Sequence, residues 1–388
     1  MKLLFPVQKL LFCFLFTLLF ACNGPVPDLS PTLKFAEQLE ANYTEFRFPD
    51  IQTRRFALEA IQPEIDRLGN EFTVTEAGRS VEGRRINRIS WGNGPVQVLL
   101  WSQMHGDEPT ATTALLDIFR WLSAEGGVAD STRTLLKDRL TLTFLPMLNP
   151  DGAARFTRRN ALGVDLNRDA LRLQSPEAQI LKNERDRLDA DWGFNLHDQS
   201  AYYGVDFPAI ENATVSILAP AYDWEKSMNA SREDAAQVIA LMNRVWQKTT
   251  PNGVGRYNDD FEPRAFGDNL QKWGTRTILI ESGGLAGDRE KQTIRRMNYV
   301  GILTALHSIA TESFEAVPLT EYWGIPENSS NAYHNLLIRN VSVTRPEGDF
   351  LMDIAFRQTE RVVPDTDNRF YLDGYISEVG DLHTFRGH

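Results

Sequence analysis

The sequence predicts an α/β fold, in which a three-layer α/β/α domain with a mixed, mostly parallel sheet is followed by a small C-terminal β region. Strand-like runs alternate with helical patterns along most of the chain, and these runs are apolar on both faces, as strands covered by helices should be. After about residue 316 the strand-like patterns continue without helices between them. With 42% apolar and 24% charged residues, the 388-residue chain has the composition of a folded protein.

The expected elements follow one another in a regular order. Two helices, near residues 31–46 and 53–68, precede a hairpin made by Phe72–Thr75 and Arg85–Ser90. The strands expected next are Val96–Trp101, Leu140–Leu145, Trp192–Leu196, Val215–Leu218 and Thr277–Ile280, and the helices are Thr110–Ser123, Pro176–Leu188, Glu233–Lys248 and Arg289–Thr311. The C-terminal strands are expected at Leu336–Val343, Phe350–Phe356 and Asn368–Ser377.

The N-terminus has the features of an export signal. Lys2 and Lys9 flank an apolar run, Leu10–Ala21, which is too short for a transmembrane helix but typical of a secretory signal peptide. The run ends in Leu19-Phe20-Ala21-Cys22, which resembles a bacterial lipoprotein cleavage site; the alternative is an ordinary secretory signal. We therefore expect a signal peptide with a candidate lipidated Cys22 (1–22), a tether (23–32), the α/β domain (33–315) and the β domain (316–388), in a protein of the periplasm or cell envelope.

Charge and cysteine content narrow the class of protein further. Cys13 and Cys22 are the only cysteines, so an exported chain keeps at most one of them and has no internal disulfide. Removing residues 1–21 changes the formal charge from −11 to −13. An acidic chain without basic clusters is not expected to bind nucleic acid.

Two histidines and a carboxylate lie at expected strand ends. His105 and Glu108 follow the run Val96–Trp101, and His197 follows Trp192–Leu196. If these strands are neighbours, the three side chains converge at one edge of the sheet, where α/β proteins commonly bind ligands. Two histidines with one carboxylate are typical of catalytic zinc, although they also suit iron or manganese. A lone His-x-x-Glu has a simpler interpretation as a solvated loop.

Further motifs make this interpretation specific. After His105-x-x-Glu108 come Asn149-Pro150-Asp151-Gly152, then Arg158-Arg159-Asn160 leading to Asp165-Leu166-Asn167-Arg168, then His197, and finally Glu281 within Ile278-Leu-Ile-Glu-Ser-Gly-Gly. In this order, over roughly Glu76 to Gly284, they resemble the zinc carboxypeptidase family of carboxypeptidase A and B type. The resemblance implies one zinc ion, Zn2+, held by His105, Glu108 and His197.

The resemblance also implies roles for other residues. Glu281 would be the catalytic carboxylate that moves protons, and Arg158, rather than its neighbour Arg159, would stabilise the developing oxyanion. Asn167 and Arg168 would bind the C-terminal carboxylate of the substrate, for which a guanidinium group is well shaped. Tyr257 matches a mobile tyrosine that closes over the substrate.

Two points stay open at this level. The residue that selects the substrate side chain falls on Arg264, Phe266 or Asp268, depending on where counting starts, and these predict acidic, apolar and basic preferences respectively. Asp198 either orients a metal ligand or lines the substrate site, or it is a plain loop residue.

The function expected from these motifs is hydrolysis of the C-terminal peptide bond of peptides by a zinc metallocarboxypeptidase. A second hypothesis keeps the same site but assigns it a murein peptide as substrate. A third is a non-catalytic binding protein, which the presence of His105, Glu108, His197, Arg168 and Glu281 argues against.

Overall fold

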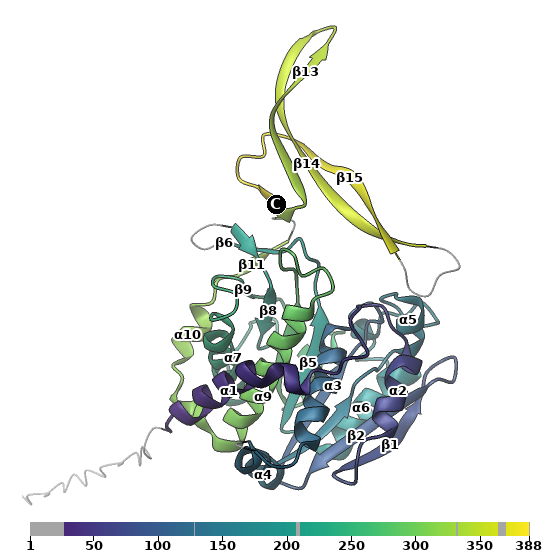
Figure 1. Cartoon of the computed structure of the whole chain (residues 1–388), viewed down its shortest axis with the longest axis vertical. Coiled ribbons are helices and arrows are strands. Elements are labelled where there is room, and N and C mark those ends of the chain that lie inside the picture. Colours follow the sequence, from purple (N-terminus) through teal and green to yellow (C-terminus); the bar gives the residue numbers. More distant parts are fainter. Residues whose placement is uncertain (1–26, 128, 207–209, 331–332, 364–369, 388) are drawn as a thin grey trace, which may run out of the picture.

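The computed structural model describes residues 27–127, 129–206, 210–330, 333–363 and 370–387. An eight-stranded mixed sheet forms its centre (Figure 1). In spatial order the strands are β1 (Phe72–Arg79), β2 (Arg85–Gly92), β4 (Leu140–Leu145), β3 (Val96–Ser102), β5 (Trp192–Asp198), β10 (Arg276–Ser282), β8 (Val215–Leu218) and β9 (Val254–Arg256). The four central strands, from β4 to β10, are mutually parallel, which confirms the predicted mixed sheet.

Helices cover both faces of this sheet and make the three predicted layers. On one face lie α3 (Thr110–Ser123), α4 (Asp130–Arg139), α7 (Ala230–Trp246) and α9 (Gln292–Thr311), with α1 (Ser30–Phe46) packed against α9. The opposite face is covered by α6 (Pro176–Leu188) and α8 (Phe266–Lys272). Shorter helices are α2 (Leu58–Asp66), α5 (Pro150–Arg155) and α10 (Leu319–Trp323).

Strand β3 shows why the central runs are apolar on both faces. Val98 and Leu100 belong to the core between the sheet and the α3 layer, whereas Leu99 and Trp101 belong to the core under α6 and α8. Side chains alternate between the two faces of a strand, so a strand covered by helices on both sides carries apolar side chains at successive positions.

The structure departs from the sequence prediction at the N-terminal end. The signal peptide and Cys22 lie outside the described residues. Helix α1 begins at Ser30, inside the segment assigned to the tether, because Pro31 is compatible with a first helical turn and Thr32 is buried beside His307. In the part of the chain that the structure describes, no helix combines the length and the hydropathy that a transmembrane span requires.

Two helices are shorter than predicted, and polar contacts explain why. Residues 53–57 precede α2 as an irregular segment with a bend at residues 53–54, in which Arg54 N donates to Glu290 Oε2 (2.9 Å). Helix α9 begins at Gln292 rather than Arg289, because the Asp288 carboxylate accepts hydrogen bonds from the backbone N–H groups of Gln292 and Thr293 (2.7 and 2.8 Å).

A buried ion pair joins the N-terminal segment to two helices of the body. Arg295 of α9 and Asp117 of α3 are paired with no side-chain exposure. Arg295 also donates to the carbonyl oxygens of Phe48 and Ile51 (2.9 and 2.7 Å). The segment that carries Arg54 is therefore fixed against the α/β body.

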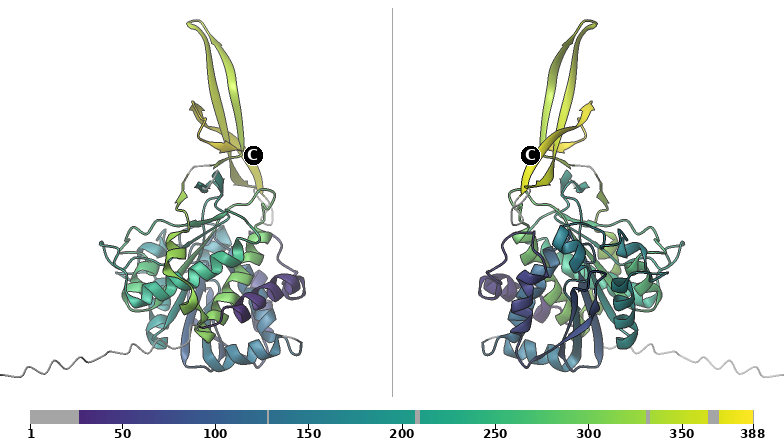
Figure 2. Two further views of the ribbon diagram at one scale, coloured as in Figure 1. Left: turned by 90° about the vertical axis from the view of Figure 1, so that its left-hand side faces the viewer. Right: turned by 90° about the vertical axis from the view of Figure 1, so that its right-hand side faces the viewer.

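The C-terminal region is a three-stranded antiparallel sheet that rises from one end of the body (Figures 1 and 2). Its strands are β13 (Leu336–Arg345), β14 (Gly348–Val362) and β15 (Phe370–Gly380). Residues 316–325, which the sequence assigns to this region, pack with the body instead: Tyr322 of α10 is buried, and its hydroxyl accepts a hydrogen bond from Ala219 N (3.1 Å). We call the sheet β13–β15 the C-terminal sheet.

Short strands lie between the body and the C-terminal sheet. Strands β6 (Gly204–Asp206), β7 (Ile210–Asn212) and β11 (Asn328–Ser329) form a small sheet, and β12 (Tyr333–His334) pairs with β16 (Arg386–Gly387). The strand β11 pairs with β6 of the body just before the chain enters the C-terminal sheet, so it holds the start of that sheet near the loop after β5.

Candidate metal centre and active site

The first two candidate ligands lie in the loop between β3 and α3. His105 and Glu108 are joined by a tight turn in which Glu108 N donates to His105 O (3.2 Å). Gly106, between them, lies against helix α5: a Cβ at this position would be 1.9 Å from the carbonyl carbon of Gly152. Only glycine fits there, so the ligand loop depends on close contact with α5.

The Asn-Pro-Asp-Gly motif provides that contact. The side chain of Asn149 caps α5 by accepting a hydrogen bond from Gly152 N (2.9 Å), and its Nδ2 donates to Met104 O (3.2 Å). Asp151, which is fully buried, accepts hydrogen bonds from Ser80 Oγ and Glu82 N (2.7 and 2.9 Å). The motif therefore holds the loop of the first two ligands against the body.

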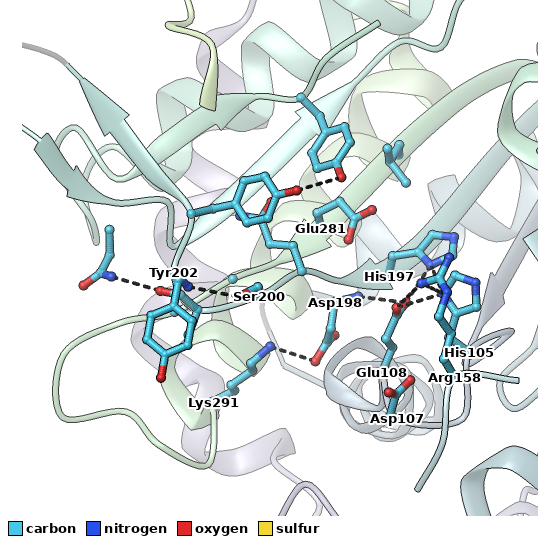
Figure 3. Close-up of a pocket in the computed structure, with 18 of the residues that line it drawn as sticks. His105, Asp107, Glu108, Arg158, His197, Asp198, Ser200, Tyr202, Glu281 and Lys291 are labelled. Atoms are coloured by element: carbon cyan, nitrogen blue, oxygen red, sulfur yellow. Dashed lines mark hydrogen bonds and ion pairs between the residues drawn. The ribbon is translucent and has the colours of Figure 1, made fainter. Parts of the chain in front are cut away.

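The third ligand and the candidate catalytic glutamate lie on neighbouring strands. His197 is near the end of β5, which pairs with β3 on one side and β10 on the other. Glu281 of β10 is in register with His197. Because residues in register on parallel strands point to the same face, the two side chains are directed toward the same cavity (Figure 3).

The three candidate ligands meet at hydrogen-bonding distance. Glu108 Oε1 is 2.8 Å from His105 Nδ1, Glu108 Oε2 is 2.6 Å from His197 Nδ1, and the two Nδ1 atoms are 3.2 Å apart. All three residues are buried. His105 and His197, which the sequence predicts to approach each other if their two strands are neighbours, are thus in contact.

A second carboxylate orients His105. Asp165 Oδ1 is 3.1 Å from His105 Nε2, and Asp165 Oδ2 accepts a hydrogen bond from Arg158 Nε (3.0 Å). A proton on His105 Nε2 satisfies Asp165 and leaves the Nδ1 lone pair directed at Glu108 and His197, which is the tautomer that a metal ligand needs. The sequence placed Asp165 in a motif but gave it no role.

These residues fit a metal ion. Two imidazole nitrogens and one carboxylate, all buried and within 4.8 Å of one another, are the donor set of catalytic zinc sites with an open position. The two Nδ1 atoms are 3.2 Å apart, so they cannot both direct a proton at each other, and a bound cation would accept the lone pairs of both. Burial opposes the charge of Glu108, but His105 and His197 outweigh it and hold the pKa of its carboxyl below the usual range.

Arg158, not Arg159, faces the cluster. Its Nη1 is 3.1 Å from His105 Nδ1 and 3.3 Å from Glu108 Oε1. Arg159 points away and donates to Gly163 O (2.9 Å). Glu281 lies in the same cavity, and burial together with the negative charge of Glu108 raises its pKa well above the usual range.

A single cavity of about 1170 Å³ contains these groups and the candidate substrate-binding residues. Arg168 and Asn167 line it, and Asn167 Oδ1 accepts a hydrogen bond from Phe266 N (2.8 Å), which fixes the side chain. Tyr257 also lines it and stacks on Tyr203, with ring centroids 5.9 Å apart. The eight residues to which the sequence assigned a metal-binding, catalytic or substrate-binding role therefore all line this cavity.

The three residues that the sequence offers for the side-chain pocket differ in their position relative to the cavity. Asp268 lines it, in the first turn of α8. Phe266 is fully buried in the core beneath α8, and Arg264 is exposed and paired with Glu262. Burial and the charge of Glu262 raise the pKa of Asp268 to about 7, although the backbone N–H of Glu262 donates to its carboxylate.

Asp198, for which the sequence left three roles open, is paired with Lys291, which sequence reasoning did not find. The Asp198 N–H donates to Glu108 Oε2 (3.2 Å), while its Oδ2 accepts from Thr110 Oγ1 (2.5 Å) and from Lys291 Nζ (3.0 Å). Lys291 also donates to Ser282 O (2.8 Å). Asp198 thus steadies a ligand through its backbone and ties the ends of β5 and β10 together, and nothing in the sequence near Asp198 points to a lysine 93 residues away.

Comparison with known proteins agrees with this site. Residues 64–210 match the family model described as zinc carboxypeptidase. Carboxypeptidase SOL1 of Arabidopsis thaliana is 38% identical over 159 residues, which are 39% of this chain and 28% of the relative. An uncharacterised protein of Zymomonas mobilis is 28% identical over 174 residues, 44% of each chain. The match thus spans less than half of each of these relatives.

Solved structures show the same fold. A metallo-carboxypeptidase from Burkholderia cenocepacia has a TM-score of 0.52 at 20% identity, covering 67% of this chain and 70% of that one. Carboxypeptidase A from Helicoverpa armigera has a TM-score of 0.50 at 16% identity, covering 74% and 81%. These structures show that the chain has the carboxypeptidase fold, and residues 64–210 match the zinc carboxypeptidase family model.

The role of Asp165 is open to a direct test. Replacing Asp165 by Asn keeps the shape of the side chain but removes the charge that favours a proton on His105 Nε2. We expect zinc affinity, measured by competition with a chromogenic chelator, to fall by about tenfold or more, as for other residues that orient metal ligands. Asp186→Asn, which alters a surface acid on α6, is the control. Equal affinities in both variants would show that Asp165 does not orient a ligand.

Proposed function

We propose that the protein is a zinc-dependent carboxypeptidase, which hydrolyses the C-terminal peptide bond of peptides. The observation that carries this proposal is that the candidate metal ligands, Glu281 and the Asn167–Arg168 pair all line one cavity. Bound zinc would lower the pKa of a ligated water to about 7 and polarise a carbonyl group. The proton transfers, the stabilisation of the oxyanion and the binding of the substrate would be performed by side chains of this chain.

Glu281 is placed to move protons. It would accept a proton from the attacking water and pass it to the leaving amine, a contribution worth roughly 10²–10⁴-fold in rate. Arg158, which already faces His105 and Glu108, would donate to the oxygen on which negative charge develops. Its own position is held by the ion pair with Asp165.

Asn167 and Arg168 would bind the free carboxylate that makes the enzyme an exopeptidase. Arg168 is anchored by Glu262 (3.3 Å) and keeps donors available to a planar carboxylate, for which its guanidinium is suited. Tyr257 would close over the substrate from its stacked position on Tyr203. Because Asp268 lines the cavity, we propose that a basic C-terminal side chain is preferred.

The setting of this activity is also a proposal. Residues 1–22 would export the protein to the periplasm or cell envelope, with Cys22 as the site of a lipid anchor to a bacterial membrane. The substrate would be a peptide, and a murein peptide is the alternative that the first assay distinguishes. Because the formal charge is −11, we do not propose nucleic acid as a partner.

The proposed function predicts chelator-sensitive release of amino acids from C-termini. Purified residues 23–388 are incubated with a pool of short L-peptides with and without a zinc chelator, and the released residues are identified. Glu281→Gln should leave zinc bound, because Glu281 is not a ligand, yet abolish turnover. Wild-type rates in this variant would remove Glu281 from the mechanism; if D-amino-acid peptides are cleaved and L-peptides are not, the substrate is a murein peptide.

Arg168 has a prediction of its own. Replacing Arg168 by Ala removes the guanidinium that binds a carboxylate, so kcat/KM should fall by about 10²-fold for free peptides, as expected for loss of a charge-assisted hydrogen-bond pair worth about 3 kcal/mol. The same peptides with an amidated C-terminus should be cleaved poorly and equally by both proteins. An equal fractional loss on both substrate sets would mean that Arg168 does not bind the carboxylate.

Asp268 predicts a pH-dependent preference. With a pKa of about 7, its carboxyl is mostly neutral at pH 6 and mostly charged at pH 8, so attraction of a cationic side chain increases with pH. The ratio of kcat/KM for C-terminal Lys to that for C-terminal Leu should rise by about three- to tenfold over this range. Taking the ratio cancels titrations common to both substrates. A similar rise in Asp268→Asn would assign the effect to another group.

A further inference from the structure

The C-terminal sheet contributes to the same cavity as the metal ligands. Leu372 of β15, Gln358 and Glu360 of β14, and residues 333–335 that lead into β13 all line it. These residues are far in sequence from every motif of the zinc carboxypeptidase match, which ends at residue 210. Figure 1 shows that the C-terminal sheet lies at one end of the body and that β14 and β15 extend toward the body at their near ends.

One side of the sheet base is anchored by Tyr202, in the loop after β5. The Tyr202 hydroxyl is 2.6 Å from Asn335 Oδ1 and 2.8 Å from Gln358 O, and it accepts a hydrogen bond from Gln358 N (2.9 Å). The guanidinium of Arg357 lies over the Tyr202 ring, 4.6 Å from its centroid. This anchor follows His197 by five residues, so it is close to the metal centre along the chain.

The other side is anchored by the segment before α2. Arg54 and Arg55 both pair with the carboxylate of Glu360. Arg55 also lies over the rings of Phe156 (4.0 Å) and Phe370 (4.9 Å), which joins the end of α5 to the start of β15. The base of β14–β15 is therefore fixed to the body at two separate places, and residues between them line the cavity.

The pairing of β14 with β15 defines which face borders the cavity. Gln358 and Glu360 are two residues apart and so point to one face, and Leu372, the register partner of Glu360, shares that face. Thr359, between them, points to the opposite face. The cavity wall is thus an ordered strand surface rather than a loop, and its backbone is held by Tyr202.

We propose that this face, made of Gln358, Glu360 and Leu372, is a subsite for the substrate residues on the N-terminal side of the scissile bond. The inference rests on the proposed function. A substrate whose carboxylate is held by Asn167 and Arg168 would have its scissile bond beside the candidate metal ligands, and the same cavity extends to the C-terminal sheet, where the rest of the substrate would lie. The substrate class that fits is an extended peptide of three or more residues, because only such a chain has residues upstream of the scissile bond that can lie along a strand face.

Charge exchange at Gln358 tests this subsite. The assay compares two N-blocked pentapeptides with the same two C-terminal residues and either Glu or Lys at the upstream positions, together with an N-blocked dipeptide that has no upstream residues. Gln358→Lys should raise the kcat/KM ratio of the Glu peptide to the Lys peptide by about three- to tenfold, and Gln358→Glu should lower it similarly, as expected for one charge pair near a surface. Dipeptide turnover should stay within about twofold of wild type, as for interactions absent from a truncated substrate.

Thr359→Lys is the matched control, since it adds the same charge one residue away on the opposite face. The anchoring contacts of Gln358 use its backbone, so its variants should fold, and their dipeptide turnover reports this directly. Unchanged peptide ratios with normal dipeptide turnover, or an equal shift in Thr359→Lys, would overturn the subsite and leave the proposed function standing. Absence of any peptide hydrolysis by the wild-type protein would instead refute the proposed function on which the subsite rests.

Discussion

The site depends on one electrostatic constraint: two imidazole nitrogens 3.2 Å apart share a buried carboxylate. A metal ion bound there would take up both ring nitrogens and the carboxylate, and the surroundings hold these three groups in place. Gly106 lets the ligand loop touch α5, Asn149 caps that helix and holds the loop backbone, and Asp165 sets the proton of His105. These contacts set the shape of the loop and hold the candidate ligands at the separations that a metal ion requires.

The sequence alone predicted those features that depend on residues close together in the chain. The strands β3, β5 and β10 were predicted almost to their ends because their apolar runs are buried on both faces. The strand-end positions of His105, Glu108 and His197 suggested a metal site, and the family resemblance implied that they are its ligands. The structure brings all the proposed site residues into one cavity, and their chemical roles stay predictions. Arg158 was chosen over Arg159 by motif position, and its contacts agree with that choice.

What the sequence could not provide depends on contacts between distant segments. The positions of Phe266 and Asp268 depend on the start of α8, which buries Phe266 in the core and brings Asp268 to the cavity lining, so that Asp268 becomes the candidate for the side-chain pocket. The Asp198–Lys291 pair joins residues 93 positions apart. Likewise, Arg54 was expected inside a helix, but it lies in an irregular segment and contacts Glu290 and Glu360, which are more than 200 residues away in the sequence.

These distant contacts bring three groups of residues to one cavity. Arg168 and Asp268 lie on the segments around α8, Tyr202 and Glu360 belong to the loop after β5 and to the C-terminal sheet, and the candidate metal ligands lie at the ends of β3 and β5. In the proposed mode of binding, a peptide held by its carboxylate at Asn167 and Arg168 would have its scissile bond beside Glu281 and would continue along the face of β14–β15, which lines the same cavity. The α/β body would then recognise the terminal residue, and the C-terminal sheet would recognise residues further along the peptide.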